Sequence, residues 1–333
     1  MGLSPVVEKS LGQEKTFMPK RINFFLIIIG LLILATGPAY FPGFTIYLFT
    51  YGMIMAVAAL ALNILLGYTG LMSFGHGMFI GSGGYTVALM IKYAGIHSFE
   101  ILIPLSILIS AGLAALVGCF CTRQIEIYFS MLTLAFGELL FALCSKFYSF
   151  TGGTDGIRVK MPTLFGYIFS RGATDFYYFV LALFLLCTAA IWVICHSPFG
   201  KTIQAVRDNE VRAGYLGLLV MKYRLIAFTI SGAFTGLAGA LAVSLTGHAV
   251  PELFQVFTSI SIVFMVILGG HTSFLGPVVG AMVFVFLQAW LKPLLFWQFF
   301  FGLSIIVLVI FLPGGVLGGV GIWARRALTR RSS

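Results

Sequence analysis

Residues 63–77 read NILLGYTGLMSFGHG and interrupt an otherwise strongly apolar chain. Within this stretch four glycines stand beside a serine, a threonine and a histidine. Irregular backbone at membrane depth is tolerated only where protein covers it or where it lines a water-filled path. We therefore predict that this stretch breaks a helix, or packs closely against a neighbouring one, beside a polar route through the molecule.

The composition of the whole chain indicates a membrane protein. It has 333 residues, of which 60% are hydrophobic and 9% charged, and its mean hydropathy is +1.05. A bilayer core requires about 20 apolar residues of helix, and apolar runs recur about ten times along this chain. We predict an all-α polytopic membrane protein of about ten transmembrane helices. The expected spans are residues 22–41, 44–66, 71–92, 101–121, 127–147, 176–195, 225–245, 254–268, 275–290 and 295–312. The eighth is short for a full crossing, so a tilted, broken or re-entrant segment is expected there.

The positions of lysine and arginine predict the orientation. With the N-terminus inside, 14 of the 20 basic residues fall on the inner side, as the positive-inside rule requires. Both termini are then cytoplasmic, and the net charge of +10 reflects topology rather than nucleic-acid binding. The expected parts are a cytoplasmic tail (1–20), a membrane domain (21–320) with an outer loop (148–175) and an inner loop (197–224), and a basic cytoplasmic tail (321–333).

The inner loop carries five basic and two acidic residues. Its Glu210, Ala213, Gly214 and Gly217 recur at helical spacings, which favours a short amphipathic helix that presents small residues to a partner. A solvated loop that merely follows the positive-inside rule is the alternative.

The sequence shows no cofactor, metal or catalytic set of its own. Gly200, Lys201 and Thr202 resemble the end of a phosphate-binding P-loop, but Cys195 occupies the place of its first glycine and no strand is expected before it. We therefore expect no ATP hydrolysis by this chain, and energy from ATP would come through partner subunits. The five cysteines lack a set of metal-ligand partners and are interpreted as packing residues.

Three further polar or glycine-rich breaks occur, at residues 128–138, 151–156 and 269–277. In carriers, such breaks are favoured places for substrate to pass. The first and last breaks share a loose likeness, GLMSFG against GHTSFLG, which raises the hypothesis of an internal inverted repeat.

Three ionisable residues each have a structural and a functional interpretation. Glu138 lies within an expected span, so its carboxylate is either bonded to a neighbouring hydroxyl or histidine, or takes part in proton coupling. His76 is either a hydrogen-bonded core residue or a ligand or proton relay. Asp155 either caps a helical turn or receives a substrate at the mouth of a pore.

Five segments together resemble one family. They are LNILLGYTGLMSFGHGMFIGSGGYTVAL (62–89), YFSMLTLAFGELL (128–140), TGGTDGI (151–157), SPFGKTIQAVRDNEVRAGYLG (197–217) and VILGGHTSFLGPVVGA (266–281). They resemble the LivM-like permease subunits of bacterial branched-chain amino-acid ABC importers, over residues 45–320. The resemblance implies a multi-pass subunit of the bacterial cytoplasmic (inner) membrane. It also implies a homologous LivH-like permease, two cytoplasmic ATPase subunits and a soluble substrate-binding protein that delivers leucine, isoleucine, valine or a related amino acid.

The resemblance also suggests roles for particular residues. Together with the arguments above, the expected translocation path comprises Gly67, Tyr68, Thr69, Gly70, Ser73, Gly75, His76, Glu138, Gly152, Gly153 and Asp155. The expected ATPase-coupling residues are Arg207, Asp208, Asn209, Glu210, Ala213 and Gly217. Similar permeases carry urea, short amides or other amino acids, and these substrates stay open.

Two other classes of protein fit the residues less well. An ion-coupled secondary carrier usually buries several carboxylates, whereas Glu138 is the one placed clearly within a span here. A membrane enzyme would need paired carboxylates, a His/Asp cluster or a nucleophile beside a base, and the sequence offers none of these patterns.

Overall fold

The computed structural model describes residues 34, 36–38, 40–124, 126–171, 174–311 and 314–316. Most of the expected span 22–41 and both predicted tails lie outside the described residues. The main helices are α3 (Gly43–Asn63), η1 (Ile64–Thr69), α4 (His76–Leu89), η2 (Met90–Ala94), α5 (Phe99–Cys121), α6 (Glu126–Lys146), α8 (Thr174–His196), α9 (Pro198–Asp208), α10 (Glu210–Tyr215), α11 (Val220–Thr246), α12 (Val256–Gly269), α13 (Gly276–Leu291) and α14 (Trp297–Phe311). The shorter elements are α7 (Tyr148–Thr151), η3 (Gly153–Asp155), η4 (Pro251–Phe254), β1 (Ile157–Arg158), β2 (Thr163–Leu164), β3 (Tyr167–Ile168) and β4 (His248–Ala249).

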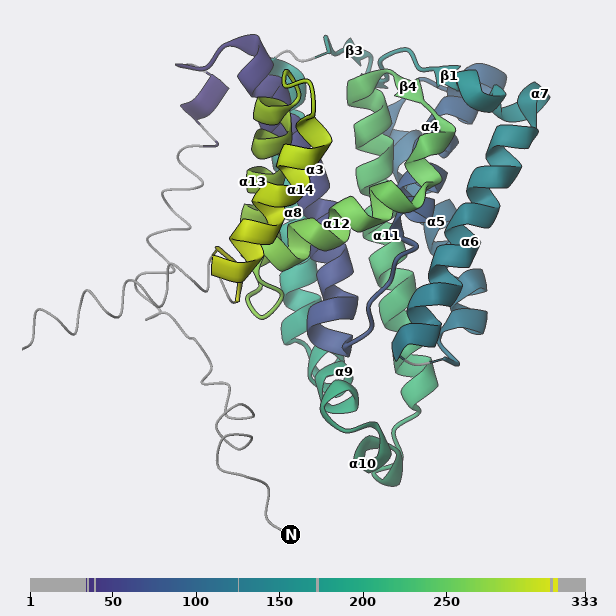
Figure 1. The fold of residues 1–333 in the computed structure, drawn as a ribbon. Helices are drawn as coiled ribbons and strands as arrows, with labels where there is room; N and C mark the ends of the chain where they lie inside the picture. Colours follow the sequence, from purple (N-terminus) through teal and green to yellow (C-terminus); the bar gives the residue numbers. More distant parts are fainter. Residues whose placement is uncertain are drawn as a thin grey trace, which may run out of the picture.

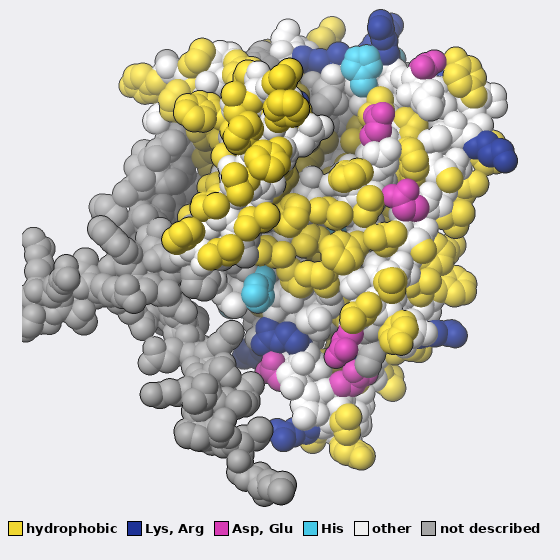
Figure 2. Space-filling view, viewed as in Figure 1, with side chains coloured by type: hydrophobic (Ala, Val, Ile, Leu, Met, Phe, Trp, Pro, Cys, Tyr) yellow, Lys and Arg dark blue, Asp and Glu magenta, His cyan; other side chains and the backbone are white. Residues whose placement is uncertain are grey.

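The long helices run side by side between two distinct ends of the molecule (Figure 1). One end carries α9 and α10, and we call it the α10 end. The other carries α7 and the strands, and we call it the α7 end. Helix α12 runs obliquely across the bundle between them. Figure 2 shows a broad hydrophobic band between the two ends, interrupted by acidic side chains.

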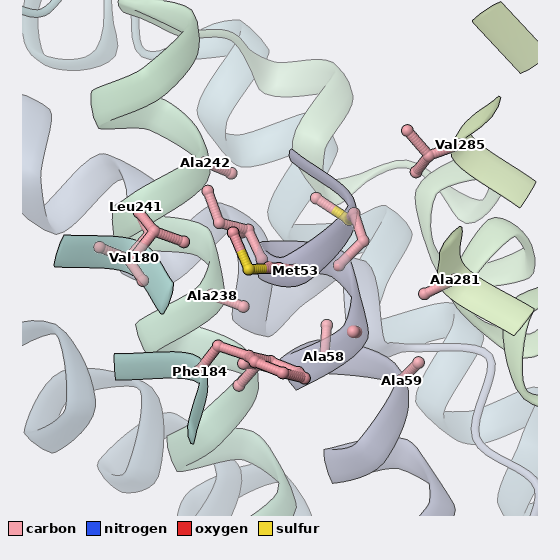
Figure 3. Packing of buried hydrophobic residues seen from close by; sticks show 14 of the residues in the cluster. Met53, Ala58, Ala59, Val180, Phe184, Ala238, Leu241, Ala242, Ala281 and Val285 are labelled. Atoms are coloured by element: carbon pink, nitrogen blue, oxygen red, sulfur yellow. The ribbon is translucent and has the colours of Figure 1, made fainter. Parts of the chain in front are cut away.

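The centre of the bundle is built on α3 and α11. In the most apolar part of Gly43–Thr69, 83% of the residues are buried, and the corresponding share is 72% for α11 but 28% for α6. Figure 3 shows Met53 and Ala58 of α3 packed among side chains of α8 and α11, including Phe184 and Leu241. In the most apolar parts of α5, α6 and α8, a third of the residues or fewer are buried, as in helices that contact lipid.

Glycines allow α4 and α11 to cross at very short range. A Cβ atom on Gly83 would lie 1.9 Å from the Gly236 carbonyl oxygen, and one on Gly239 would lie 2.1 Å from the Ile80 carbonyl oxygen. At the α12–α13 crossing, a Cβ atom on Gly280 would lie 1.9 Å from the Met265 carbonyl oxygen. These contacts are of the small-residue kind that brings helix backbones together in membranes.

Most of the expected spans are helices. Within the described residues, five helices are long and apolar enough to cross a membrane, and α12, α13 and α14 are shorter apolar helices. The total of ten crossings, the position of the termini and the internal repeat stay predictions. The short eighth span is the 14-residue α12, which runs across the neighbouring long helices (Figure 1), and its tilted, broken or re-entrant course in a membrane stays a prediction.

The predicted break at residues 128–138 and the start of one predicted span need correction. Residues 128–138 do not break the chain, because they lie within the uninterrupted helix α6. The Thr133 hydroxyl donates to the Ser130 carbonyl of its own helix at 2.9 Å, and the Ser130 hydroxyl lies 3.1 Å from the Glu126 carbonyl, so polar residues are accommodated there without a break. The expected span 71–92 starts too early, since α4 begins at His76.

The expected outer loop is a folded cap at the α7 end. Strands β1 and β4 pair antiparallel, with Ile157 opposite Ala249, and β2 pairs with β3. Arg171 donates hydrogen bonds to the carbonyls of Val159 and Ser244. The cap is thereby fixed to the end of α11.

The expected inner loop consists of α9, α10 and the first turn of α11. Ser197 caps α9 by accepting from Gly200 N, and Asn209 caps α10 by accepting from Arg212 N at 2.8 Å. The predicted short helix is confirmed as α10, but its predicted small-residue face is wrong. Ala213 is buried, and Gly217 lies beyond the helix end with a φ of +81°.

Candidate functional site

The glycine-rich stretch at residues 63–77 contains a true break between two helices, η1 and α4. The chain leaves η1 at Gly70, whose φ is +75°, and regains helical structure only at His76. Thr69 donates to the Ile64 carbonyl at 2.8 Å, and Leu71 N donates to the Leu65 carbonyl at 3.0 Å. The start of the break is thus hydrogen-bonded to the end of η1.

The break is attached to α6 along its length. Ser130 Oγ donates to the Met72 carbonyl at 2.6 Å, and Phe74 N donates to Thr133 Oγ1 at 3.3 Å. A Cβ atom on Gly75 would lie 2.4 Å from the Thr133 carbonyl oxygen. Gly75 is therefore required for this close approach of the break to α6.

His76 is a fully buried core histidine with both ring nitrogens satisfied. Its Nε2 lies 2.8 Å from Ser231 Oγ and its Nδ1 lies 3.1 Å from Ser73 Oγ. Ser231 donates its own proton to the Ala61 carbonyl at 2.6 Å, so it can only accept from His76. The network therefore places a ring proton on Nε2. His76 and Ser73 have no exposed surface in this conformation, so their place in a translocation path stays a prediction.

Glu138 holds the start of α12. Its Oε1 accepts a hydrogen bond of 2.9 Å from Val256 N, the first residue of that helix. A carboxylate is stabilised at this position because the first N–H groups of a helix lack partners inside it. The predicted partner, a hydroxyl or a histidine, is wrong, since the partner is a backbone N–H. Nearby, Gly77 N donates to Ser259 Oγ at 2.7 Å, so the starts of α4 and α12 lie side by side.

Arg207 joins α9 to the break. Its guanidinium donates to the Gly67 carbonyl through Nη1 and to Asp208 Oδ1 through Nε and Nη2. A Cβ atom on Gly70 would lie 2.7 Å from Arg207 Cγ. Arg207, expected only as a coupling residue, therefore lies against residues that were expected to line the path.

The first and last glycine-rich breaks meet beside Arg207. A Cβ atom on Gly67 would lie 2.6 Å from the His271 carbonyl oxygen, so only glycine allows this contact. The pKa of His271 is lowered by partial burial and by the positive charge of Arg207. Gly67 and His271, about 200 residues apart in the sequence, are thus in contact beside α9.

Helix α10 is tied to α11 by an ion pair. Arg224 donates from Nη1 and Nη2 to the two carboxylate oxygens of Glu210, at 3.0 and 2.7 Å. The Arg224 side chain is only 9% exposed and that of Glu210 is 42% exposed. Such a bidentate pair fixes orientation as well as distance. The pair therefore fixes α10 against the start of α11.

The exposed face of α10 is apolar, which the sequence analysis missed. Val211, Tyr215 and Leu216 are at least 66% exposed. Beside them a groove of about 340 Å³ is lined by Gly217, Leu218, Leu219, Lys222, Tyr223 and Ile226. Large apolar residues in a segment of otherwise charged composition could have predicted this apolar surface. The prediction used the spacing of glycine and alanine instead and therefore selected another face of the helix.

The outer candidates lie at the other end of the molecule. Gly152, Gly153 and Gly156 have positive φ values of 78°, 54° and 69° and shape a tight turn against β4. Asp155 is exposed, and its carboxylate accepts no hydrogen bond from the described residues, so the expected capping is not observed. The structure therefore does not bring Gly152, Gly153 and Asp155 together with residues 67–76.

Metal and disulfide sites are not found in the described part of the chain. No group of three or more His, Cys, Asp or Glu residues is placed there to hold a metal ion. The cysteines there are free, and Cys119 is exposed whereas the other four are buried.

Comparison with known proteins identifies the family. The model of the family described as "Branched-chain amino acid transport system / permease component" matches residues 44–312. The chain belongs to this family. The permease is 32% identical over 305 residues to the high-affinity branched-chain amino acid transport system permease protein LivM of Escherichia coli (strain K12), covering 83% of this chain and 72% of that protein. It is 23% identical over 314 residues to the probable branched-chain amino acid transport permease protein LivM of Methanocaldococcus jannaschii, covering 78% and 89%.

A shorter part of the chain is similar to permeases that are named after other substrates. The fructose import permease protein FrcC of Rhizobium meliloti is 29% identical over 124 residues, which is 36% of this chain and 34% of that protein. No solved structure matches the chain significantly. The chain is thus a multi-pass transport permease of the membrane and not an enzyme.

Proposed function

We propose that this permease is the membrane-spanning subunit of an ATP-driven importer for branched-chain or related amino acids in the bacterial cytoplasmic membrane. It would form half of the translocation path with a homologous LivH-like permease, and two ATPase subunits and a soluble binding protein would complete the system. The family and the relatives' names support the substrate class. The single observation that carries the mechanism is the contact of Arg207 in α9 with the Gly67 carbonyl in η1, the helix that leads into the break.

The ATPase would dock on α10 at the cytoplasmic side. Exposed apolar residues gathered on one surface mark an interaction site, and Val211, Tyr215 and Leu216 form such a surface beside the groove. Two links lead from this surface into the bundle, namely the Glu210–Arg224 pair to α11 and the Arg207 contact to the break. Closure of the ATPase would thereby move the helices that surround the break.

The second permease would cover the face formed by α6 and the start of α12. Glu138 is half-buried on this face, and a carboxylate directed at lipid is costly. Phe257, the second residue of α12, is 74% exposed. A partner subunit or a water-filled path would satisfy Glu138, and the zwitterionic substrate would pass between the two permeases.

Replacing Arg207 with glutamine is expected to lower ATP-driven uptake by about 5- to 150-fold, the range of a typical coupling energy between sites. Glutamine removes the guanidinium that joins α9 to the Gly67 carbonyl, so ATPase closure would no longer reach the break. The measurement is uptake of radiolabelled leucine by cells, normalised to the amount of permease in the membrane. The matched control is Lys201→Gln, an exposed cation of the same helix. Uptake in Arg207→Gln equal to that of the control would disprove the link.

Replacing Glu138 with glutamine is expected to leave ATP-driven uptake within about twofold of wild type, whereas leucine at this position lowers it strongly. Glutamine retains an oxygen that can accept from Val256 N, but leucine leaves that N–H without a partner, at a cost of about 1–3 kcal/mol. Uptake measured across a pH series tests the pair. If glutamine abolishes uptake as completely as leucine does, the proton-coupled secondary carrier gains support.

Co-purification tests the proposed composition. The tagged permease is extracted from its native membrane, its partners are identified by mass spectrometry, and ATPase activity is measured with candidate binding proteins and substrates. We expect a second permease, two ATPases and stimulation by binding protein loaded with leucine, isoleucine or valine. If only urea or a short amide stimulates the ATPase, the proposed substrate class is wrong. A permease that purifies alone and transports without ATP would contradict the whole proposal.

A further inference from the structure

The α7 end carries a basic depression that takes no part in the proposed translocation path or ATPase docking. It has a volume of about 400 Å³ and is lined by Lys92, His97, Arg158 and Lys160, together with Ile91, Gly156 and Ile157. Figure 2 shows lysine and arginine side chains gathered at this end of the molecule. The positive-inside rule makes a cluster of cations unexpected on the side predicted to be external.

The floor of the depression is held in place by the bundle. Arg158 lies in β1, opposite His248 of β4, and Val159 N donates to the Gly247 carbonyl at 2.9 Å. A Cβ atom on Gly156 would lie 2.3 Å from the Ala249 carbonyl oxygen. Lys92 comes from η2, which continues α4. The cations are therefore presented by a fixed framework at the ends of α4 and α11.

The cations of the depression form no ion pair with a carboxylate of the described residues. The two ion pairs among the described residues are Arg207–Asp208 and Glu210–Arg224, both at the α10 end. Lys92 lies over the Tyr93 ring, with 5.0 Å between Nζ and the ring centroid. Two carboxylates of the outer cap are engaged elsewhere, because Glu100 accepts from Phe165 N and Asp175 accepts from the Tyr167 hydroxyl. Lys92, Arg158 and Lys160 are therefore not ion-paired among the described residues and are available to an external partner.

We propose that the depression lined by Lys92, Arg158 and Lys160 docks an acidic surface of the soluble protein that delivers the substrate. This inference rests on the proposed function, because it requires a delivery protein on the external side. Several carboxylates arranged on a protein surface match three exposed cations, whereas a free amino acid offers one carboxylate that its own ammonium group offsets. Complementary charge of this kind accelerates association and sets orientation. Docking would act directly on the end of α4, the helix that begins at the break.

The test measures binding of the leucine-loaded binding protein from the same transport system to the whole transporter complex. The complex is placed in nanodiscs of phosphatidylcholine, and association is followed by surface plasmon resonance at several salt concentrations. The double variant Arg158→Glu/Lys160→Glu is expected to raise Kd by at least about tenfold, mainly through slower association, and to reduce the dependence on salt. Basal ATPase activity without binding protein is expected to stay unchanged.

The matched control is Lys146→Glu/Lys292→Glu, which makes the same change of charge at two cations expected on the same side but outside the depression. We expect its Kd to remain within about twofold of wild type. Acidic residues of the binding protein are also replaced singly by lysine. Where the replaced residue contacts the depression, we expect binding to the Arg158→Glu/Lys160→Glu variant to be restored.

Three outcomes would overturn the inference. An unchanged Kd in Arg158→Glu/Lys160→Glu, with normal stimulation of the ATPase by binding protein, rejects the docking site and leaves the proposed function intact. A difference between wild type and variant that arises only when the nanodiscs contain phosphatidylglycerol assigns the depression to a lipid phosphate. If no binding protein binds or stimulates the wild-type complex, the proposed function fails together with this inference.

Discussion

Replacing Glu210 with arginine is expected to abolish ATP-driven uptake while leaving the permease in the membrane. The change places a second guanidinium against Arg224, whose side chain is 9% exposed. Breaking a buried ion pair costs about 3–5 kcal/mol because one charge is left uncompensated. Since Glu210 is 42% exposed, we expect a cost near the lower end of that range. Helix α10 would separate from α11, and the apolar docking surface would lose its orientation.

The reciprocal exchange separates the ion pair from other effects of the substitution. Glu210→Arg combined with Arg224→Glu restores opposite charges at the two positions, so uptake is expected to recover to a substantial fraction of wild type. Glu210→Gln, which removes the charge without adding a like one, is expected to have an intermediate effect. Membrane content is measured by immunoblotting and uptake with radiolabelled leucine. Wild-type uptake in Glu210→Arg would place the coupling surface elsewhere.

Replacing Gly83 with alanine is expected to prevent stable assembly of the bundle. Its Cβ atom would lie 1.9 Å from the Gly236 carbonyl oxygen, so α4 and α11 would have to move apart along their whole crossing. Overpacking of this kind typically costs about 1–3 kcal/mol, and more where backbone must move. The measurement is thermal unfolding in detergent, followed by fluorescence-detected size-exclusion chromatography. We expect a lower unfolding temperature and an aggregated fraction.

Gly112→Ala is the matched control for this prediction. Gly112 lies within α5, and a Cβ atom there would meet no heavy atom within 4 Å. Because alanine favours helix more than glycine does by about 1 kcal/mol, this variant is expected to be as stable as wild type or slightly more stable. Equal unfolding temperatures for Gly83→Ala and Gly112→Ala would contradict the close crossing.

Much of the fold could be predicted from hydropathy and glycine content. Continuous apolar runs predict helices because backbone groups in lipid must be satisfied within the segment, and α5, α6, α8 and α11 lie close to their expected ranges. The break at residues 70–75 was signalled by its glycines and polar residues. The polar composition of residues 128–138 wrongly predicted a break, because serine and threonine hydroxyls can donate to carbonyls of their own helix.

The contacts of the candidate site could not be predicted in the same way. His76 meets Ser231 from a helix 155 residues further along the chain, and no local pattern marks that serine among the others of α11. Arg207 was assigned to coupling, yet its contact with Gly67 depends on the tertiary approach of α9 to the break. Ala213 was expected to face a partner, but the Glu210–Arg224 pair turns it toward the bundle. Local residue spacing predicted the segments that form the candidate site. Tertiary packing determines which face of each segment is buried and which is exposed.

The central claim is that ATP hydrolysis on partners docked at α10 drives amino-acid movement past the break. The most direct measurement is uptake of radiolabelled leucine into proteoliposomes that contain the purified complex, with binding protein outside and ATP inside. We predict uptake that requires ATP, requires binding protein and falls in Arg207→Gln but not in Lys201→Gln. Leucine uptake by the permease alone without ATP, or equal uptake by the two variants, would contradict the account.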